Sequence, residues 1–210
     1  LGLLFYRRDL LERYGYHGPP RTWAELEVMA DDIQSRELAA GKCDFWGFLW
    51  QGMPGESLVC CAVEWQHAEG GGMILPPEDG MRAKNRPLIK AVQRARSWLG
   101  TISPPNSNEY HESRCICSWR QGNAAFMRQW ALSFPFFEEP VIGDLTGWTI
   151  LPAGSARHAA ALGGWPLVVH NAPASSQRAI ALIDELASLP AQRQRALMRN
   201  PYPPSLRVLY

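Results

Sequence analysis

The chain has 210 residues with 21 basic and 20 acidic side chains, which give a formal net charge of +1. No long run of one charge occurs, so the sequence lacks the clustered basic face that nucleic-acid backbones require. No stretch approaches the roughly 18 consecutive apolar residues of a membrane-spanning helix. A chain of this length buries roughly 70% of its unfolded surface and can build a core without disulfides or metals.

The sequence pattern of the first half of the chain predicts strands that alternate with helices. In order, these are a strand at 3–7, helices at 9–14 and 22–41, a strand at 45–50, and helices at 56–68, 86–99 and 111–120. Thr22 and Glu25 form the sequence pattern of a capping box, which opens the second helix. Pro87 stands in a first helical turn, where its missing N–H costs nothing.

The second half continues this alternation. It predicts strands at 124–127, 148–151 and 166–169, a helix capped by Ser175 or Ser176, and a last helix at 192–199. The capped helix should turn Ile180, Ile183, Leu186 and Ala187 inward and end at Pro190. Because strands alternate with helices, we expect an α/β fold with a sheet flanked by helices.

The start of the chain and its cysteines bear on its context. Leu1–Tyr6 is apolar and runs directly into Arg7 and Arg8, so the charges stand on the wrong side for a signal peptide. We therefore expect the chain to be a fragment that begins inside a fold, or the product of a gene that has lost its 5′ part. Five cysteines, with a vicinal pair at 60 and 61, predict free and mostly buried thiols.

Two of the nine tryptophans follow short segments suited to a binding cleft. The strand at 124–127 leads into a loop that we expect to carry Trp130. Trp165 follows Gly163 and Gly164, where the missing Cβ lets backbone approach closely. Indole rings offer a flat apolar face and one N–H donor, so two rings at one cleft could stack on a sugar. Trp50 fits either this site or the core. Core positions are predicted for five further tryptophans: Trp23, Trp65, Trp98, Trp119 and Trp148.

No combination of residues predicts catalysis or a metal. Three possible zinc ligands lie close together in the sequence, at His111, Cys115 and Cys117. A structural zinc site needs four ligands, and no fourth one stands at a suitable spacing. The acidic pairs Asp31–Asp32 and Glu138–Glu139 are adjacent in sequence, whereas glycosidases need two carboxylates across a cleft. We therefore expect no catalytic residue, no metal and no cofactor, and a protein that is not an enzyme.

Several stretches in register resemble the extracytoplasmic solute-binding proteins of ABC sugar importers, of the maltose/trehalose-binding type. The matching residues are 3–11, 22–26, 47–52, 64–65, 121–130, 162–165 and 204–210. Their order and spacing also agree, so the resemblance covers essentially the whole chain. Two departures stand out: the Pro and Tyr that usually follow Trp130 are Ala131 and Leu132 here, and Leu206 replaces an arginine of the closing motif.

The resemblance implies a two-lobed protein that binds sugar between its lobes and delivers it to an ABC transporter permease in the periplasm or another extracytoplasmic space. Residues 1–160 would form most of the second lobe, and 161–210 a crossing strand and helices that normally pack on the first. Trp130, Gly163, Gly164, Trp165 and Trp50 are the implied saccharide contacts. The alternative is a remnant without ligand that self-associates through its C-terminal helices. Which sugar is bound stays open.

Overall fold

The computed structural model describes residues 1–72, 85–131, 133, 142–164, 167–169 and 176–197. The chain divides into two compact units, one formed by 1–131 with 136–162 and the other by 132–135 with 163–210. The four-stranded sheet belongs to the first unit, as do the helices α1 to α5. The second unit contributes helices α6 and α7.

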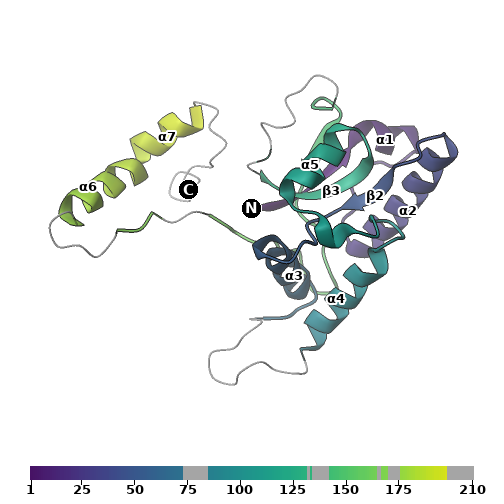
Figure 1. Cartoon of the computed structure of the whole chain (residues 1–210), viewed down its shortest axis with the longest axis horizontal. Helices are drawn as coiled ribbons and strands as arrows, with labels where there is room; N and C mark the ends of the chain where they lie inside the picture. The colour runs from purple at the N-terminus through teal and green to yellow at the C-terminus, as the bar shows by residue number, and fades with distance from the viewer. Residues whose placement is uncertain (73–84, 132, 134–141, 165–166, 170–175, 198–210) are drawn as a thin grey trace. The chain divides into compact units, whose positions relative to one another are not determined.

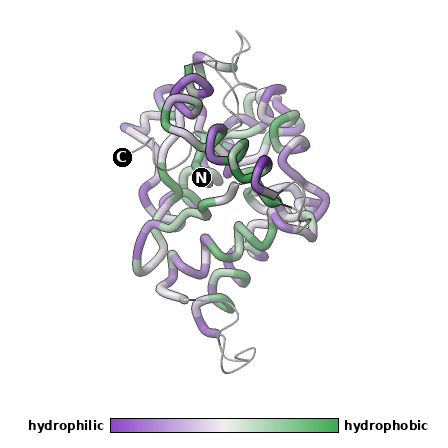
Figure 2. Tube along the Cα trace, turned by 90° about the vertical axis from the view of Figure 1, so that its left-hand side faces the viewer, coloured by the Kyte–Doolittle hydropathy of each residue, from purple (hydrophilic) through white to green (hydrophobic). Residues whose placement is uncertain are grey.

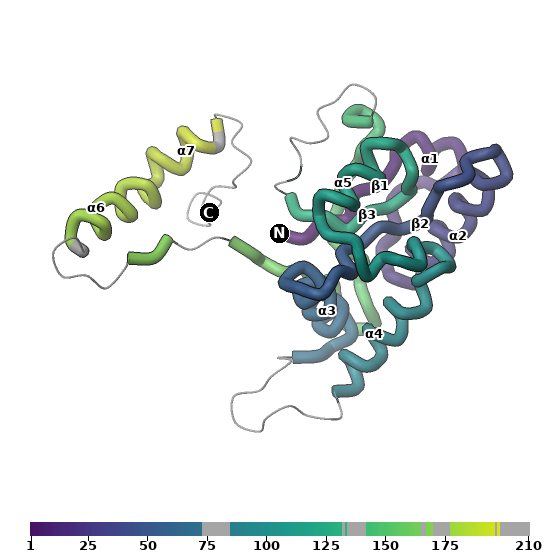
Figure 3. Tube along the Cα trace, viewed as in Figure 1, coloured from purple at the N-terminus to yellow at the C-terminus, as the bar shows by residue number. Residues whose placement is uncertain are grey.

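The sheet has the strand order β2-β3-β1-β4. Its strands are β1 (Gly2–Arg7), β2 (Trp46–Leu49), β3 (Ala124–Trp130) and β4 (Thr146–Thr149). β1 pairs antiparallel with both β3 and β4, whereas β2 pairs parallel with β3. β1 and β3 thus lie side by side although they are far apart in the sequence (Figure 3).

The helices follow the predicted order. They are α1 (Arg8–Arg13), α2 (Trp23–Ala39), α3 (Glu56–Ala68), α4 (Arg86–Trp98), α5 (Glu112–Arg120), α6 (Ser176–Ala187) and α7 (Leu189–Leu197), with a 3-10 turn at Ser107–Glu109. Polar and apolar residues alternate along the helical turns (Figure 2). Among the described residues, no helix is both long and apolar enough to cross a membrane.

Helices cover both faces of the sheet (Figure 1). Successive strand residues point to opposite faces, so in β1 Leu4 packs into a cluster with α2, α3 and α4, while Phe5 packs into one with α5. Both side chains have no exposed surface. The expected α/β fold with a flanked sheet is therefore confirmed.

An aromatic cluster forms the centre of the larger core. It contains Trp23, Phe48, Trp50, Trp65 and Trp98, with ring centroids 5.2 to 6.2 Å apart. The predicted core positions of Trp23, Trp65, Trp98 and Trp119 are confirmed. The prediction for Trp148 was wrong, because its side chain is 56% exposed on β4, which lies at an edge of the sheet formed by the described residues.

Several predicted boundaries need correction. β3 extends to Trp130, so this tryptophan ends a strand and does not lie in a loop. Residues 167–169 of the predicted 166–169 strand are described and are not in a strand. Pro190 does not end α6: it stands in the first turn of α7, a position that tolerates proline because no N–H is needed there. On α6, Ile180 and Ala187 are exposed, while Ile183 and Leu186 are half-buried.

Candidate functional site

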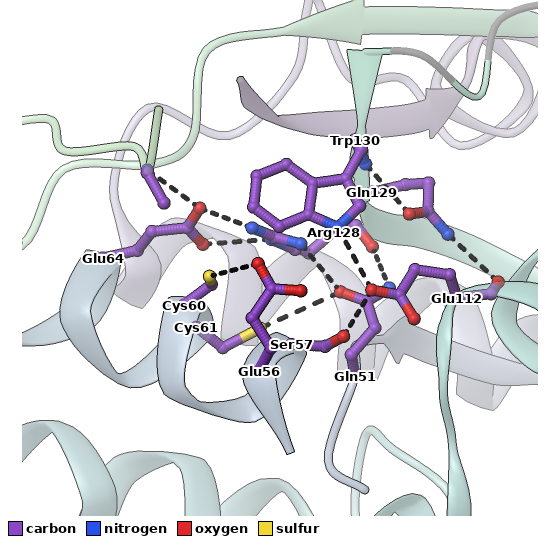
Figure 4. A network of polar contacts seen from close by, with 11 residues as sticks. Gln51, Glu56, Ser57, Cys60, Cys61, Glu64, Glu112, Arg128, Gln129 and Trp130 are labelled. Carbon is purple, nitrogen blue, oxygen red and sulfur yellow. Dashed lines mark hydrogen bonds and ion pairs between the residues drawn. The ribbon is translucent and has the colours of Figure 1, made fainter. Parts of the chain in front are cut away.

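Trp130 is half-buried at the end of β3 and is held on one ring face and at its edge (Figure 4). The guanidinium carbon of Arg128 lies 4.0 Å from the centroid of the indole ring. The indole Nε1–H donates to Glu112 Oε1 over 3.2 Å. Because one face carries a cation and the single donor is used, the indole can offer a ligand only apolar ring surface.

Arg128 lies under the indole because residues two apart on a strand share a face. Its side chain and that of Glu64 on α3 have no exposed surface. Nη2 of Arg128 donates to Glu64 Oε1 at 2.6 Å and Nε donates to Oε2 at 3.0 Å. Such a two-point arginine–carboxylate pair fixes the plane of both groups. Arg128 is therefore a rigid support for the tryptophan.

Gln51 completes the pairing of Arg128. Nη1 of Arg128 donates to Gln51 Oε1 at 3.0 Å, and Gln51 Nε2 donates back to the carbonyl oxygen of Arg128 at 2.8 Å. Gln51 comes two residues after the last residue of β2, so the contact joins the ends of two neighbouring strands. Each of the three guanidinium nitrogens thus donates to an oxygen, as a buried ion requires.

Glu112 opens α5 and borders the edge of the indole. Burial by itself would raise the pKa of Glu112, but hydrogen bonds from the Ser57 hydroxyl and from Trp130 hold that pKa below its ordinary value. The carboxylate is therefore ionised at neutral pH. An ionised carboxylate beside an apolar ring can accept hydrogen bonds from the hydroxyls of a stacked sugar.

The neighbouring cysteines are not reactive thiolates. Burial raises the pKa of Cys61 to about 12, and burial together with Glu56 raises the pKa of Cys60. A thiol that stays protonated is a poor nucleophile and metal ligand. All five cysteines are free; Cys61 and Cys115 are buried, while Cys43 and Cys117 are exposed. The prediction of free thiols is confirmed. The prediction that most of them are buried is wrong, because only Cys61 and Cys115 are buried.

Of the other predicted contacts, Trp50 belongs to the core and not to the surroundings of Trp130. Trp50 lies in the aromatic core, is 5% exposed and donates its N–H to Ser103 Oγ at 3.2 Å. Gly163 and Gly164 are exposed residues of the second unit, and a Cβ added at Gly164 would meet nothing within 4 Å. Trp165 lies outside the described residues. A common site for Trp130 and the double glycine stays a prediction.

A groove of about 550 Å³ lies beside the Arg128–Glu64 pair. Val63, Glu64 and His67 of α3 line one side, and residues 157–162 line the other. The ring of His158 is held by a 2.9 Å contact between Nδ1 and the carbonyl oxygen of Leu151. Among the described residues, no three His, Cys, Asp or Glu side chains are placed to hold a metal ion.

Comparison with known proteins shows what the chain is similar to. No family model matches the chain. A probable ABC transporter-binding protein of Deinococcus radiodurans is 36% identical over 213 residues, which is 100% of this chain and 50% of that protein. The maltose-bound T. maritima MalE3 has a TM-score of 0.84 and 32% identity over 99% of this chain and 53% of that one. The chain is thus similar, over its whole length, to binding proteins of ABC transporters.

The chain spans about half the length of the proteins that it matches. The same fold occurs in a solute-binding protein from Thermotoga lettingae bound to α-D-tagatose, with a TM-score of 0.78 at 24% identity. The Deinococcus radiodurans protein is named as a binding protein, in agreement with the prediction that the chain is not an enzyme.

The sequence alone did not predict a role for the polar residues that lie under Trp130. Arg128 had a usable signal, because it directly follows the apolar run Ala124–Met127 inside what proved to be one strand. Glu64 stood out only as part of the matching stretch 64–65, and Glu112 carried no signal because it looks like an ordinary polar residue of a helix. Only the packing of α3 and α5 against β3 brings them to the tryptophan.

Proposed function

We propose that the chain carries one side of the carbohydrate-binding site of an ABC-importer solute-binding protein. The observation that carries this proposal is Trp130, whose indole is held in one plane by Arg128 and Glu112 at the end of a strand. A rigid aromatic face beside an ionised acceptor suits a sugar, which has apolar C–H patches and hydroxyl groups. The 32% identity to a maltose-bound protein supports the choice of ligand class.

The proposed ligand is a disaccharide of the maltose or trehalose type, bound without covalent chemistry. One sugar ring stacks on Trp130, and Glu112 accepts from a hydroxyl at the edge of the indole. Gly163, Gly164 and Trp165 contribute backbone contacts and a second aromatic face. Trp50 is left out of this set because it is buried in the core.

The proposed organisation follows from the same relatives. Residues 1–160 form most of a second lobe, and 161–210 form a crossing segment and helices that pack on a first lobe. In this organisation the whole protein works in an extracytoplasmic space and hands the sugar to a transporter permease. The match of this chain to about half of each relative supports the assignment.

This half of a cleft should bind sugar weakly. Small-molecule sites bury most of the ligand, and a single lobe covers only one side of it. We expect a Kd in the millimolar range or weaker for the 210-residue chain, equivalent to about 4 kcal/mol.

Titration calorimetry of the chain with maltose, trehalose and glucose tests the proposal. Trp130→Ala should abolish the weak disaccharide heat, because it removes the stacking surface. Trp148→Ala is the matched control: it removes another tryptophan, 56% exposed on β4, and should leave binding unchanged. Equal binding by wild type and Trp130→Ala would refute the proposed site, and micromolar affinity would show that the missing side is dispensable.

A second candidate function is self-association without a ligand. The observation that favours it is the apolar surface of the second unit, where exposed side chains belong to both helices. They are Ile180 at 50%, Leu182 at 59%, Leu189 at 44% and Leu197 at 85% exposure. Apolar surface of this kind seeks a partner, and a second copy of the chain would supply one.

A further inference from the structure

The buried pair Arg128–Glu64 contacts more than the tryptophan. Glu64 Oε1 accepts from Arg128 Nη2 at 2.6 Å and also from the backbone N–H of Ala161 at 3.0 Å. Ala161 precedes Gly163 by two residues, so its anchoring point lies just before the double glycine. One carboxylate therefore binds both the support of Trp130 and the segment that leads out of the first unit.

β1 closes this arrangement from a third side. The backbone N–H of Gly2 donates to the carbonyl oxygen of Ala161 at 3.2 Å. A Cβ built on Gly2 would lie 2.2 Å from Glu64 Oε1, closer than any real contact permits. Only glycine fits here without displacing the carboxylate. The position of Glu64 is thus determined by α3, β1, β3 and the segment at Ala161 together.

We propose that Glu64 and Arg128 are positioning residues that hold the Trp130 ring and the backbone at Ala161 in one fixed geometry. Arg128 acts on the indole by stacking, and Glu64 orients the guanidinium and anchors the amide of Ala161. The significance for sugar binding rests on the proposed function, because Trp130 and the chain beyond Ala161 carry the proposed contacts. The geometry itself is a property of the free protein.

Two measurements on the sugar-free protein test this positioning role. The first is the near-ultraviolet circular dichroism of Trp130, obtained as the difference between each protein and its Trp130→Phe derivative. The second is the hydrogen-exchange rate of the Ala161 amide. In Glu64→Gln the tryptophan signal should decrease, and the Ala161 amide should exchange at least about tenfold faster, because its charged acceptor is lost.

Glu37→Gln is the matched control. Glu37 is a carboxylate on α2 with 1% side-chain exposure, paired with Arg13 and Lys42 and remote in sequence from both reporters. Its substitution should lower stability but leave the Trp130 signal and the Ala161 rate unchanged. If Glu37→Gln alters both reporters as much as Glu64→Gln does, the effect is a general loss of stability and the proposal is wrong.

A second variant covers the case in which Glu64→Gln does not fold, since removing one partner of a buried pair leaves an uncompensated charge. Arg128→Met/Glu64→Leu removes both charges, a change that folded proteins often tolerate. It should show the same two losses, and retention of both signals would overturn the proposal. Because no sugar is present, these outcomes are independent of whether the wild-type chain binds carbohydrate.

Discussion

At the scale of single residues, Glu69 shows how one buried carboxylate can join separate segments. Its side chain is 1% exposed at the end of α3 and accepts from Lys90 at 2.5 Å, from Ser155 at 2.7 Å and from Arg94. Burial alone would raise the pKa of Glu69, but the hydrogen bonds outweigh it and lower the pKa to about 2. Glu69 therefore holds α4 and the segment at Ser155 against α3 in its ionised form.

The lowered pKa of Glu69 predicts a loss of stability in acid. Because the folded pKa is about 2 and the ordinary value is 4.5, the stabilisation is complete above 4.5 and is lost as the pH falls toward 2. In Glu69→Gln this part of the pH dependence should disappear, and the free energy of unfolding at pH 7 should fall by about 2 kcal/mol. Urea denaturation between pH 2 and pH 7 measures both; equal acid sensitivity in the two proteins would contradict the prediction.

At the scale of elements, α2 begins where its sequence predicts, but its cap differs from the expected box. Thr22 Oγ1 accepts from the backbone N–H of Glu25 at 3.1 Å, as a capping threonine should. The Glu25 carboxylate does not bond the N–H of Thr22; it accepts from the N–H of Arg21 at 2.7 Å. Beside this cap Thr22 takes part in a β-bridge with Ala153, in which the Trp23 N–H donates to the Ala153 carbonyl oxygen and the Ala153 N–H donates to that of Arg21.

Thr22→Ala should lower the free energy of unfolding by about 1 kcal/mol, because it removes the acceptor for a helix N–H. Thr22→Ser keeps this acceptor and should retain most of the stability. Chemical denaturation of the two variants gives the comparison. Equal destabilisation by Ser and Ala would mean that the methyl group of Thr22, and not its hydroxyl, is what matters.

At the scale of the whole molecule, the second unit differs from the first in how its helices are covered. α2, α3 and α4 bury apolar residues in a common cluster, whereas α6 and α7 leave Ile180 and Leu189 about half exposed. Two short helices cannot enclose a core of their own. In the proposed function another lobe covers them; in the alternative a second copy of the chain does.

Concentration-dependent light scattering should separate these possibilities. If the alternative is right, the chain forms dimers or larger species, and Ile180→Glu shifts it toward monomer because a charge cannot be buried in an apolar contact. Val28→Glu, an equal change at a 68% exposed position on α2, should have no effect. A wild-type chain that stays monomeric at all concentrations would rule self-association out.

Most of the fold could be predicted from the sequence because local patterns determine it. The capping residues of α2, the proline at the start of α4 and the apolar strand at 124–127 each specify an element through near neighbours in the chain. Strand ends were less certain: β3 extends to Trp130 because pairing with β1 continues as far as Gly2. That pairing is a tertiary contact, invisible to local periodicity.

The sequence by itself determined the order of the helices, the existence of β1 to β4, the α/β class and the resemblance to solute-binding proteins. It also singled out Trp130, but only the tertiary structure decided what surrounds it. The partners Arg128 and Glu64 are 64 residues apart, and whether two such charges meet depends on how α3 packs against the sheet. For the same reason Trp50 is buried and Trp148 is exposed, since burial depends on which strands and helices become neighbours.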